Sequence, residues 1–157
     1  MSRFSESKQQ GSGFVRHACA AEDFAAIEAV VFDKPWAEAD FVAGPERRQA
    51  SLWLEDRCVS FIYGHVVAGE AEVWRIATLP ECRGKGYAKR VLAAFLESCR
   101  EAGAESVFLE VSSDNIDALG FYLRAGFAVT GRRADYYGPG EDALLLGLSL
   151  EKNAPAD

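Results

Sequence analysis

The segment at residues 83–88, Arg-Gly-Lys-Gly-Tyr-Ala, carries the most informative chemistry in the chain. Its glycines, Gly84 and Gly86, lie between an expected strand and an expected helix, where glycine permits positive φ and lets the backbone approach a ligand closely. Free N–H groups at a helix N-terminus attract an anion, and Arg83 and Lys85 add positive charge. The segment therefore predicts a loop that binds phosphate or pyrophosphate.

Spacing excludes two familiar phosphate loops. The chain has no GxxxxGK[ST] motif, and Lys89 stands where a GxGxxG motif needs its third glycine. Taken alone, residues 83–88 are equally consistent with a glycine-rich turn whose arginine and lysine side chains are solvated.

The elements that must position this loop follow from the spacing of apolar residues. Residues 86–101 form the clearest amphipathic helix, with one apolar stripe and a charged opposite side. We expect further helices at residues 21–32, 37–43 and 116–125. We expect strands at residues 14–18, 51–54, 58–65, 70–78, 106–111, 127–131 and 143–150, with a turn-rich segment at 137–140. This order predicts a mixed α/β sheet covered by helices.

The composition indicates one globular domain. The chain has 157 residues, of which 49% are hydrophobic and 26% charged, as is typical of a single soluble domain. We expect a flexible tail at residues 1–13, the domain at 14–150 and a C-terminal tail at 151–157. No apolar stretch approaches the ~20 residues of a membrane-spanning helix, and the first residues lack the apolar core of a secretion signal. These features predict a cytoplasmic protein without a membrane partner.

Charge and cysteine content narrow the class further. The net charge of −7 argues against direct nucleic-acid binding, although it allows a basic peptide as substrate. We expect reduced thiols and no metal site, because no cysteines form a CxxC pair and no histidine completes a metal-ligand spacing. The residues concerned are Cys19, Cys58, Cys82, Cys99, His17 and His65.

The chain resembles the GCN5-related N-acetyltransferases over residues 14–150, since residues 83–88 match that family's Q/R-x-x-G-x-G/A signature for acetyl-CoA. Its second half resembles the ribosomal-protein-alanine N-acetyltransferase branch. The matching patches are LEV at 109–111, Asn115, Ala118, FY at 121–122, AGF at 125–127, Gly131-x-Arg133-x-x-Tyr136-Tyr137 and EDA at 141–143. The resemblance implies a seven-stranded, mostly antiparallel sheet with about four helices. Its strands at 70–78 and 106–111 would run parallel and splay apart at one end.

The resemblance also implies which residues bind acetyl-CoA as the acetyl donor. The loop would hold the pyrophosphate, and the end of the preceding strand would pair with the pantetheine arm. These residues are Ile76, Ala77, Thr78, Arg83, Gly84, Lys85, Gly86, Tyr87 and Ala88. The side-chain amide of Asn115 would bind the same arm, and Asn115 could equally cap the helix that follows it.

Two catalytic roles follow from the same resemblance. Glu110 would be the general base, directly or through water, because an α-amine with a pKa near 7.7–8.0 is mostly protonated at neutral pH. Tyr122 would protonate the departing thiolate, since a tyrosine hydroxyl is a donor that stays protonated at pH 7. The alternatives are a solvated carboxylate at Glu110 and a core aromatic at Tyr122. Glu72 is the next candidate base.

The acceptor implied by the branch is the N-terminal α-amine of a ribosomal protein that begins with alanine. Arg75 stands where the branch commonly has asparagine, and Ser112 and Asp114 replace an arginine and a serine. These departures bear on the choice of acceptor and leave the acetyl-CoA chemistry in place. The alternatives are an acetyltransferase of a small amine, an amino acid or a lysine side chain, and a CoA-binding module without catalysis.

Overall fold

The structure, a computed structural model, describes residues 13–17 and 20–150. Of the two expected tails, only Gly13 is among the described residues. Cys19, in the expected domain, also lies outside the described residues. The strands are β1 (Phe14–Arg16), β2 (Arg47–Leu54), β3 (Arg57–Val67), β4 (Glu70–Thr78), β5 (Ser106–Ser112), β6 (Ala128–Gly138) and β7 (Glu141–Ser149). The helices are α2 (Ala21–Val31), α3 (Tyr87–Glu101) and α4 (Ile116–Arg124), with 3₁₀ helices η1 (Glu38–Asp40) and η2 (Pro80–Cys82).

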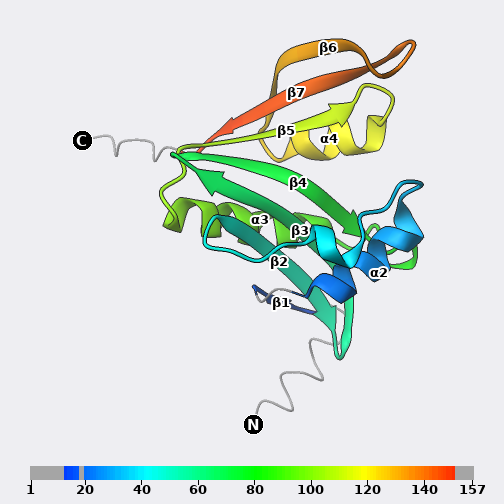
Figure 1. Cartoon of the computed structure of the whole chain (residues 1–157), viewed down its shortest axis with the longest axis vertical. Helices are drawn as coiled ribbons and strands as arrows, with labels where there is room; N and C mark the ends of the chain where they lie inside the picture. The colour runs from blue at the N-terminus through cyan, green and yellow to red at the C-terminus, as the bar shows by residue number, and fades with distance from the viewer. Residues whose placement is uncertain (1–12, 18–19, 151–157) are drawn as a thin grey trace.

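All seven strands join one sheet in the order β1-β2-β3-β4-β5-β7-β6 (Figure 1). Every neighbouring pair is antiparallel except β4 and β5, which run parallel. A parallel pair needs a crossover connection, and α3 supplies it between β4 and β5. The expected seven-stranded, mostly antiparallel sheet is therefore confirmed.

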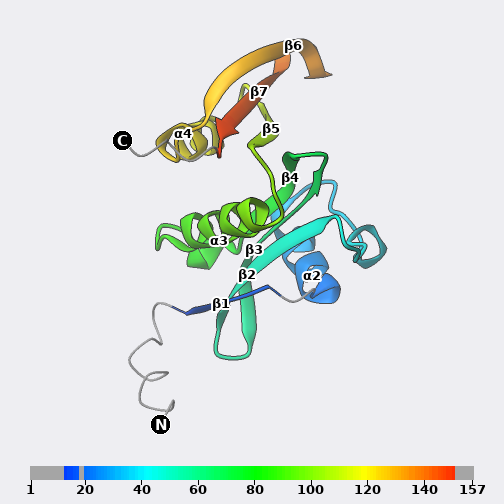
Figure 2. The same cartoon turned by 90° about the vertical axis from the view of Figure 1, so that its left-hand side faces the viewer.

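The helices cover the two faces of the sheet unequally. α3 buries its apolar stripe, which includes Val91, Phe95 and Cys99, against β2, β3 and β4. α2 packs on the opposite face of β3 and β4, whereas α4 lies on the same side as α3 (Figure 2). In the described part of the chain, no helix covers the other face of β5, β7 and β6, and none is long and apolar enough to cross a membrane.

An aromatic cluster fastens α2 and the segment after it to the sheet. The ring of Phe24 on α2 stacks on Phe61 of β3 with centroids 4.4 Å apart. Phe41 packs edge-on against both rings and also against Tyr63, whose hydroxyl donates to the Val42 carbonyl. Packing therefore holds the segment between α2 and β2 against β3.

A β-bulge interrupts the pairing of β3 with β4. Tyr63 lies opposite Arg75 and Gly64 opposite Val73, so Trp74 is the extra residue. The backbone comes so close here that a Cβ at Gly64 would lie 2.0 Å from the Glu72 carbonyl oxygen. Only glycine fits at this position, and the bulge changes the direction of β4 before its last residues.

The three largest differences from the sequence-based expectation concern the segment after α2 and the lengths of β2 and β6. The helix expected at 37–43 is only the 3₁₀ turn Glu38–Asp40, so the described residues form three α-helices, close to the expected number of about four. β2 begins at Arg47 and β6 continues to Gly138. Both extensions are polar or exposed, so they lack the apolar alternation that predicts a strand.

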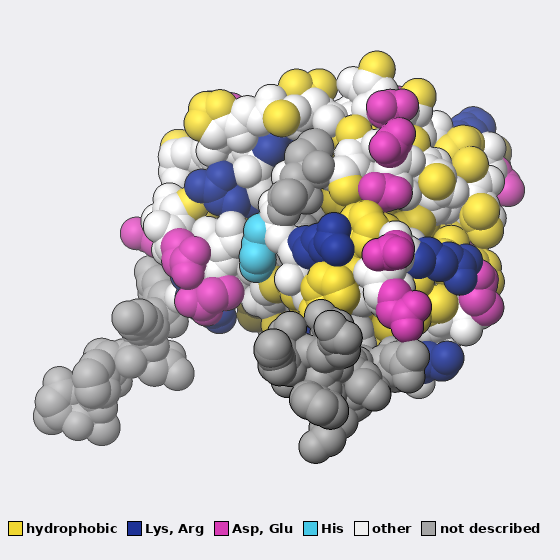
Figure 3. Space-filling view, turned by 90° about the horizontal axis from the view of Figure 1, so that it is seen from below, with side chains coloured by type: hydrophobic (Ala, Val, Ile, Leu, Met, Phe, Trp, Pro, Cys, Tyr) yellow, Lys and Arg dark blue, Asp and Glu magenta, His cyan; other side chains and the backbone are white. Residues whose placement is uncertain are grey.

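Charge is mixed on the underside of the molecule. Seen from below, basic and acidic side chains are interspersed among hydrophobic ones (Figure 3). This face therefore carries no broad basic surface of the kind that binds a nucleic-acid backbone.

Candidate active site

The parallel pairing of β4 with β5 is short. Residues 70–72 lie opposite residues 106–108, and beyond them the two strands separate (Figure 1). This divergence confirms the expected splay of the two central strands. It leaves the second half of β4 without a strand partner on its β5 side.

The exposed side of β4 offers main-chain groups to a ligand. Leu79 N donates to the Val59 carbonyl of β3 at 2.9 Å. The N–H and C=O groups of successive residues point to opposite sides of an antiparallel strand. Because the Leu79 N–H points toward β3, the N–H and C=O groups of Ala77 also point toward β3, and those of Ile76 and Thr78 point toward β5. An extended ligand chain can therefore pair with Ile76 and Thr78 by main-chain hydrogen bonds.

The glycine loop, residues 83–86, lies between η2 and the start of α3. Gly84 and Gly86 have φ of +78° and +83°, and a Cβ at either position would meet no atom within 4 Å. Gly86 is the N-cap of α3. In contrast to α2 and α4, α3 has no acidic residue in its first turn, and no side chain caps its N-terminus. The start of α3 thus lacks both a side-chain cap and a nearby carboxylate in its first turn, and Arg83 and Lys89 add positive charge, which fits a pyrophosphate.

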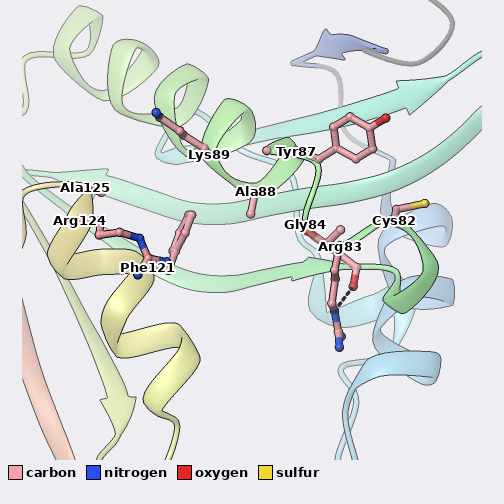
Figure 4. A pocket seen from close by; sticks show the side chains of 11 residues that line it. Cys82, Arg83, Gly84, Tyr87, Ala88, Lys89, Phe121, Arg124 and Ala125 are labelled. Atoms are coloured by element: carbon pink, nitrogen blue, oxygen red, sulfur yellow. Dashed lines mark hydrogen bonds between the residues drawn. The ribbon is translucent and has the colours of Figure 1, made fainter.

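A cavity of about 410 Å³ lies between this loop, α3 and α4. Figure 4 shows Phe121 and Arg124 reaching from α4 toward α3, with Lys89 on α3 nearby. Arg83 Nε donates to the Thr78 carbonyl at 3.2 Å, which ties the loop to the end of β4. Three cations (Arg83, Lys89 and Arg124) and two aromatic rings (Tyr87 and Phe121) thus line a space suited to a phosphate-bearing ligand.

The cavity includes most of the residues expected to bind the cofactor, and some that were not expected. Thr78, Arg83, Gly84, Gly86, Tyr87 and Ala88 line it, whereas Ile76, Ala77, Lys85 and Asn115 do not. Asn115 caps α4, accepting a hydrogen bond from Ala118 N at 3.1 Å. The additional lining residues are Cys82, Lys89, Phe121, Arg124 and Ala125. In the sequence, the two cations among them look like the solvated side of a helix, so no local signal marks them.

Glu110 lies in a different cavity. A cleft of about 650 Å³, which we call the acceptor cleft, is lined by Trp36, Glu72, Val73, Trp74, Glu110, Arg133, Tyr136 and Tyr137. Arg133 Nη2 lies 3.5 Å from Glu110 Oε2 and orients this carboxylate. Partial burial raises the pKa of Tyr137, and the nearby negative charge of Glu110 adds to the rise. The cleft therefore combines two carboxylates with four aromatic rings.

The second carboxylate of the cleft is held by its neighbours. Trp74 Nε1 donates to Glu72 Oε1 at 2.9 Å, and His65 Nε2 lies 3.3 Å from the same oxygen. This hydrogen bond shows that the Trp74 and Glu72 side chains lie on the same side of β4. Glu72 is thus a second carboxylate held in a fixed position in the same cleft as Glu110.

Tyr122 lies in α4, on the side of the molecule that holds the loop cavity. Its ring is buried and packs edge-on against Phe121 and Phe127, with centroids 5.2 and 5.4 Å apart. Burial raises the pKa of Tyr122 above its usual value, so its hydroxyl keeps its proton at neutral pH. Packing alone does not distinguish the two sequence interpretations, because a buried tyrosine can be both a core residue and a proton donor.

Arg75 has a structural partner that the sequence did not indicate. It makes a bidentate ion pair with the fully buried Glu28 of α2, at 2.8 Å from Nε and 2.6 Å from Nη2. Trp36 N donates to the same carboxylate at 2.9 Å, and the Arg75 guanidinium lies over the Phe32 and Trp36 rings. Arg75 therefore fixes Trp36, one wall of the acceptor cleft.

Ser112, the second departure from the branch, lies at the end of β5 and donates a hydrogen bond to Glu141 at 2.6 Å.

The remaining chemistry-bearing groups are accounted for separately. Cys58, Cys82 and Cys99 are free thiols, and burial raises the pKa of Cys58 and of Cys99 to about 12. Within residues 13–17 and 20–150, no three His, Cys, Asp or Glu side chains gather into a candidate metal site.

Comparisons with known proteins agree with this geometry. The model of the Acetyltransferase (GNAT) family matches residues 14–127. A ribosomal protein bS18-alanine N-acetyltransferase of Salmonella typhimurium is 29% identical over 121 residues, which are 74% of this chain and 82% of that protein.

Solved structures share the fold. The ribosomal-protein-S18-alanine N-acetyltransferase from Escherichia coli superposes with a TM-score of 0.82 at 22% identity, covering 92% of this chain and 98% of that one. An aminoglycoside 6'-N-acetyltransferase complexed with coenzyme A gives 0.80 at 10% identity, covering 90% and 99%. The family match, together with a glycine loop and cationic cavity suited to CoA, shows that this chain belongs to the GNAT acetyltransferase family and is an acetyl-CoA-dependent N-acetyltransferase.

Proposed function

We propose that this enzyme acetylates the N-terminal α-amine of a ribosomal protein whose chain begins with alanine. The observation that carries the proposal is the acceptor cleft, where Glu110 and Glu72 lie among four aromatic rings. Carboxylates and aromatic faces both attract a protonated amine. The names of the Salmonella typhimurium and Escherichia coli relatives support the protein substrate.

The cofactor is held by residues on the α3 and α4 side. When bound, acetyl-CoA supplies the acetyl group as a thioester. The N–H groups at the start of α3, with Arg83 and Lys89, hold the pyrophosphate. The main-chain groups of Ile76 and the Thr78 N–H pair with the pantetheine arm, while the Thr78 carbonyl accepts from Arg83. The Asn115 side chain caps α4 through its oxygen, which leaves its amide nitrogen to contact the same arm.

Glu110 is the general base in this proposal. It takes a proton from the acceptor ammonium, directly or through water, because only the neutral amine is a nucleophile. Arg133 holds the carboxylate in place. The acceptor amine then reacts directly with the donor in a ternary complex, and no side chain of the enzyme becomes acetylated.

Tyr122 is the general acid. Because burial raises its pKa, the hydroxyl remains protonated over the pH range in which an α-amine becomes neutral. It donates this proton to the sulfur of the departing thiolate. The assignment places the base on the acceptor side of the splay and the acid on the cofactor side.

Mass spectrometry of an acceptor panel tests the proposal. The panel contains a peptide with a free N-terminal alanine followed by basic residues, the same peptide with a blocked N-terminus and an internal lysine, a polyamine and an aminoglycoside. We expect one acetyl group on the α-amine of the first peptide and far slower turnover of the others.

Two outcomes would contradict the assignment. Equal turnover of the blocked peptide would make a lysine ε-amine the target. Preference for the polyamine or the aminoglycoside would make the protein a small-amine acetyltransferase. A parallel assay of thiol release from acetyl-CoA shows whether the preparation is catalytically active.

A further inference from the structure

A second hollow adjoins the acceptor cleft on the face of the sheet that no described helix covers over β5, β7 and β6. It has a volume of about 530 Å³. We call it the outer groove and define it by Val67, Glu70, Glu72, Phe108, Thr130 and Leu145. Glu72, Glu110 and Arg133 line both hollows, so the outer groove continues the acceptor cleft along the sheet.

The floor of the outer groove is apolar and is shaped by two glycines. A Cβ at Gly147 would lie 3.3 Å from the Phe108 ring, and a Cβ at Gly131 would lie 2.9 Å from Leu145 Cδ1. Phe108 and Leu145 therefore lie against bare backbone and leave a shallow surface. Phe108 is 38% exposed, so part of its ring is open to a ligand that lies along this floor.

The walls of the outer groove are mainly acidic. Glu70, Glu72 and Glu110 line it, against the single arginine Arg133. Val67, 42% exposed, adds an apolar contact at the end farther along β3. A ligand that complements this surface presents basic and apolar side chains together.

We infer that the outer groove binds the residues that follow the acetylated residue of the acceptor polypeptide, as an extended segment with basic and apolar side chains. This inference rests on the proposed function. A chain whose first residue occupies the acceptor cleft passes directly into the outer groove, because the two share three lining residues. In an extended chain, side chains alternate in direction and each residue adds about 3.3 Å, so the next few residues span the floor.

Contacts in the outer groove would make the enzyme bind a polypeptide more tightly than a small amine. A small amine fills the acceptor cleft and makes no contact in the outer groove. A polypeptide gains burial of Phe108 and Val67 and the attraction of the carboxylates. These contacts lie away from the reacting atoms, so they are equally strong in the ground and transition states and lower KM without changing kcat.

A peptide length series measures the effect. Peptides of two, four, six and eight residues share one alanine-initiated sequence with basic and apolar residues after the first position, and each ends in an amide. We expect KM to fall by about tenfold or more between the shortest and the longest, and kcat to stay constant. An eight-residue peptide with acidic residues after the alanine should show no such gain.

Variants locate the contact. Phe108→Ser should raise KM for the eight-residue peptide by about tenfold and raise KM for the dipeptide, which has only one residue to place in the outer groove, by a much smaller factor. Val129→Ser is the matched control, because Val129 is 50% exposed on β6 and lines neither hollow. Val67→Ser, at the exposed end of β3, gives an independent test should Phe108→Ser fail to fold.

The outcomes separate this inference from the proposed function. If all peptides are acetylated on the α-amine with the same KM, or if Phe108→Ser and Val67→Ser leave the length dependence intact, the outer groove is not the polypeptide site and the proposed function stands. If no peptide of any length is acetylated on its α-amine, both fail together.

Discussion

The cofactor cavity and the acceptor cleft are built in opposite ways. The cofactor cavity, the space between the glycine loop, α3 and α4, is formed mainly by residues 78–89, in which positive φ at Gly84 and Gly86 and the start of α3 present main-chain groups. A second segment at the end of α4 completes it with Phe121, Arg124 and Ala125. The acceptor cleft is formed by side chains from four separate segments, which meet only in the folded protein. Main-chain recognition suits a ligand that never changes, whereas side-chain recognition allows the acceptor to differ between relatives of one fold.

The sharpest test of this division is Tyr122→Phe. Removing the proton donor should lower kcat by about 10³-fold with little change in either KM, since the hydroxyl acts mainly in the transition state. Raising the pH from 7 to 9 should not restore the rate, because a higher pH makes protonation of the thiolate harder. Full turnover by a folded Tyr122→Phe would show that the ring serves packing alone.

Glu110→Gln tests the acceptor side. The rate at pH 7 should fall by about 10²-fold and recover largely by pH 9, where solvent deprotonates an α-amine with a pKa near 7.7–8.0. The measurement is a pH–rate profile beside that of the unmodified enzyme, with Glu72→Gln as the comparison variant. A profile of Glu110→Gln that follows the unmodified enzyme would move the base to Glu72.

Gly86→Asp tests the cofactor side alone. Aspartate is strained at the positive φ of Gly86, and its carboxylate places a negative charge at the N-terminus of α3. The affinity for CoA should therefore fall by about 10²-fold in calorimetric titration. A folded variant with unchanged affinity would remove the pyrophosphate role of the loop. Gly103→Asp is the matched control, because Gly103 also has positive φ but lies beyond the far end of α3.

Glu28→Gln should affect the acceptor side with the smallest change in rate. Breaking the buried pair with Arg75 costs about 3 kcal/mol of folding stability, and it loosens Trp36. We expect a lower melting temperature and a severalfold higher KM for the acceptor, with the KM for acetyl-CoA unchanged. Glu81→Gln, which breaks the exposed pair with Arg57, should leave all three quantities unaltered. Equal rises in both KM values would argue against separate walls for the two sites.

The same division explains what the sequence could predict. The helix at α3 and the loop before it are local, so apolar periodicity and two glycines were sufficient to place them within one residue. β6 beyond residue 131 is held by pairing with β7 while its side chains stay exposed, and no hydrophobic pattern marks such a strand. Tertiary pairing decided its length.

The acceptor cleft lay beyond sequence reasoning for a related reason. Arg75 and Glu28 are separated by 47 positions, and neither residue has a local feature that indicates the other. Trp74 lines the cleft at a bulge opposite Gly64, and no local sequence pattern marks this bulge. The family resemblance identified Glu110 and Tyr122 as candidate catalytic residues. The aromatic walls of the cleft, and the Glu28–Arg75 ion pair that holds Trp36, could be found only from the structure.

The short pairing of β4 with β5 has a kinetic consequence. Past Glu72 the sheet divides. In the proposed assignment, the two substrates approach the division from opposite sides, each by its own route. Neither substrate obstructs the arrival or departure of the other, so the order of addition is not imposed by the architecture. The free coenzyme and the acetylated chain can likewise leave in either sequence, and a slow release of one does not trap the other.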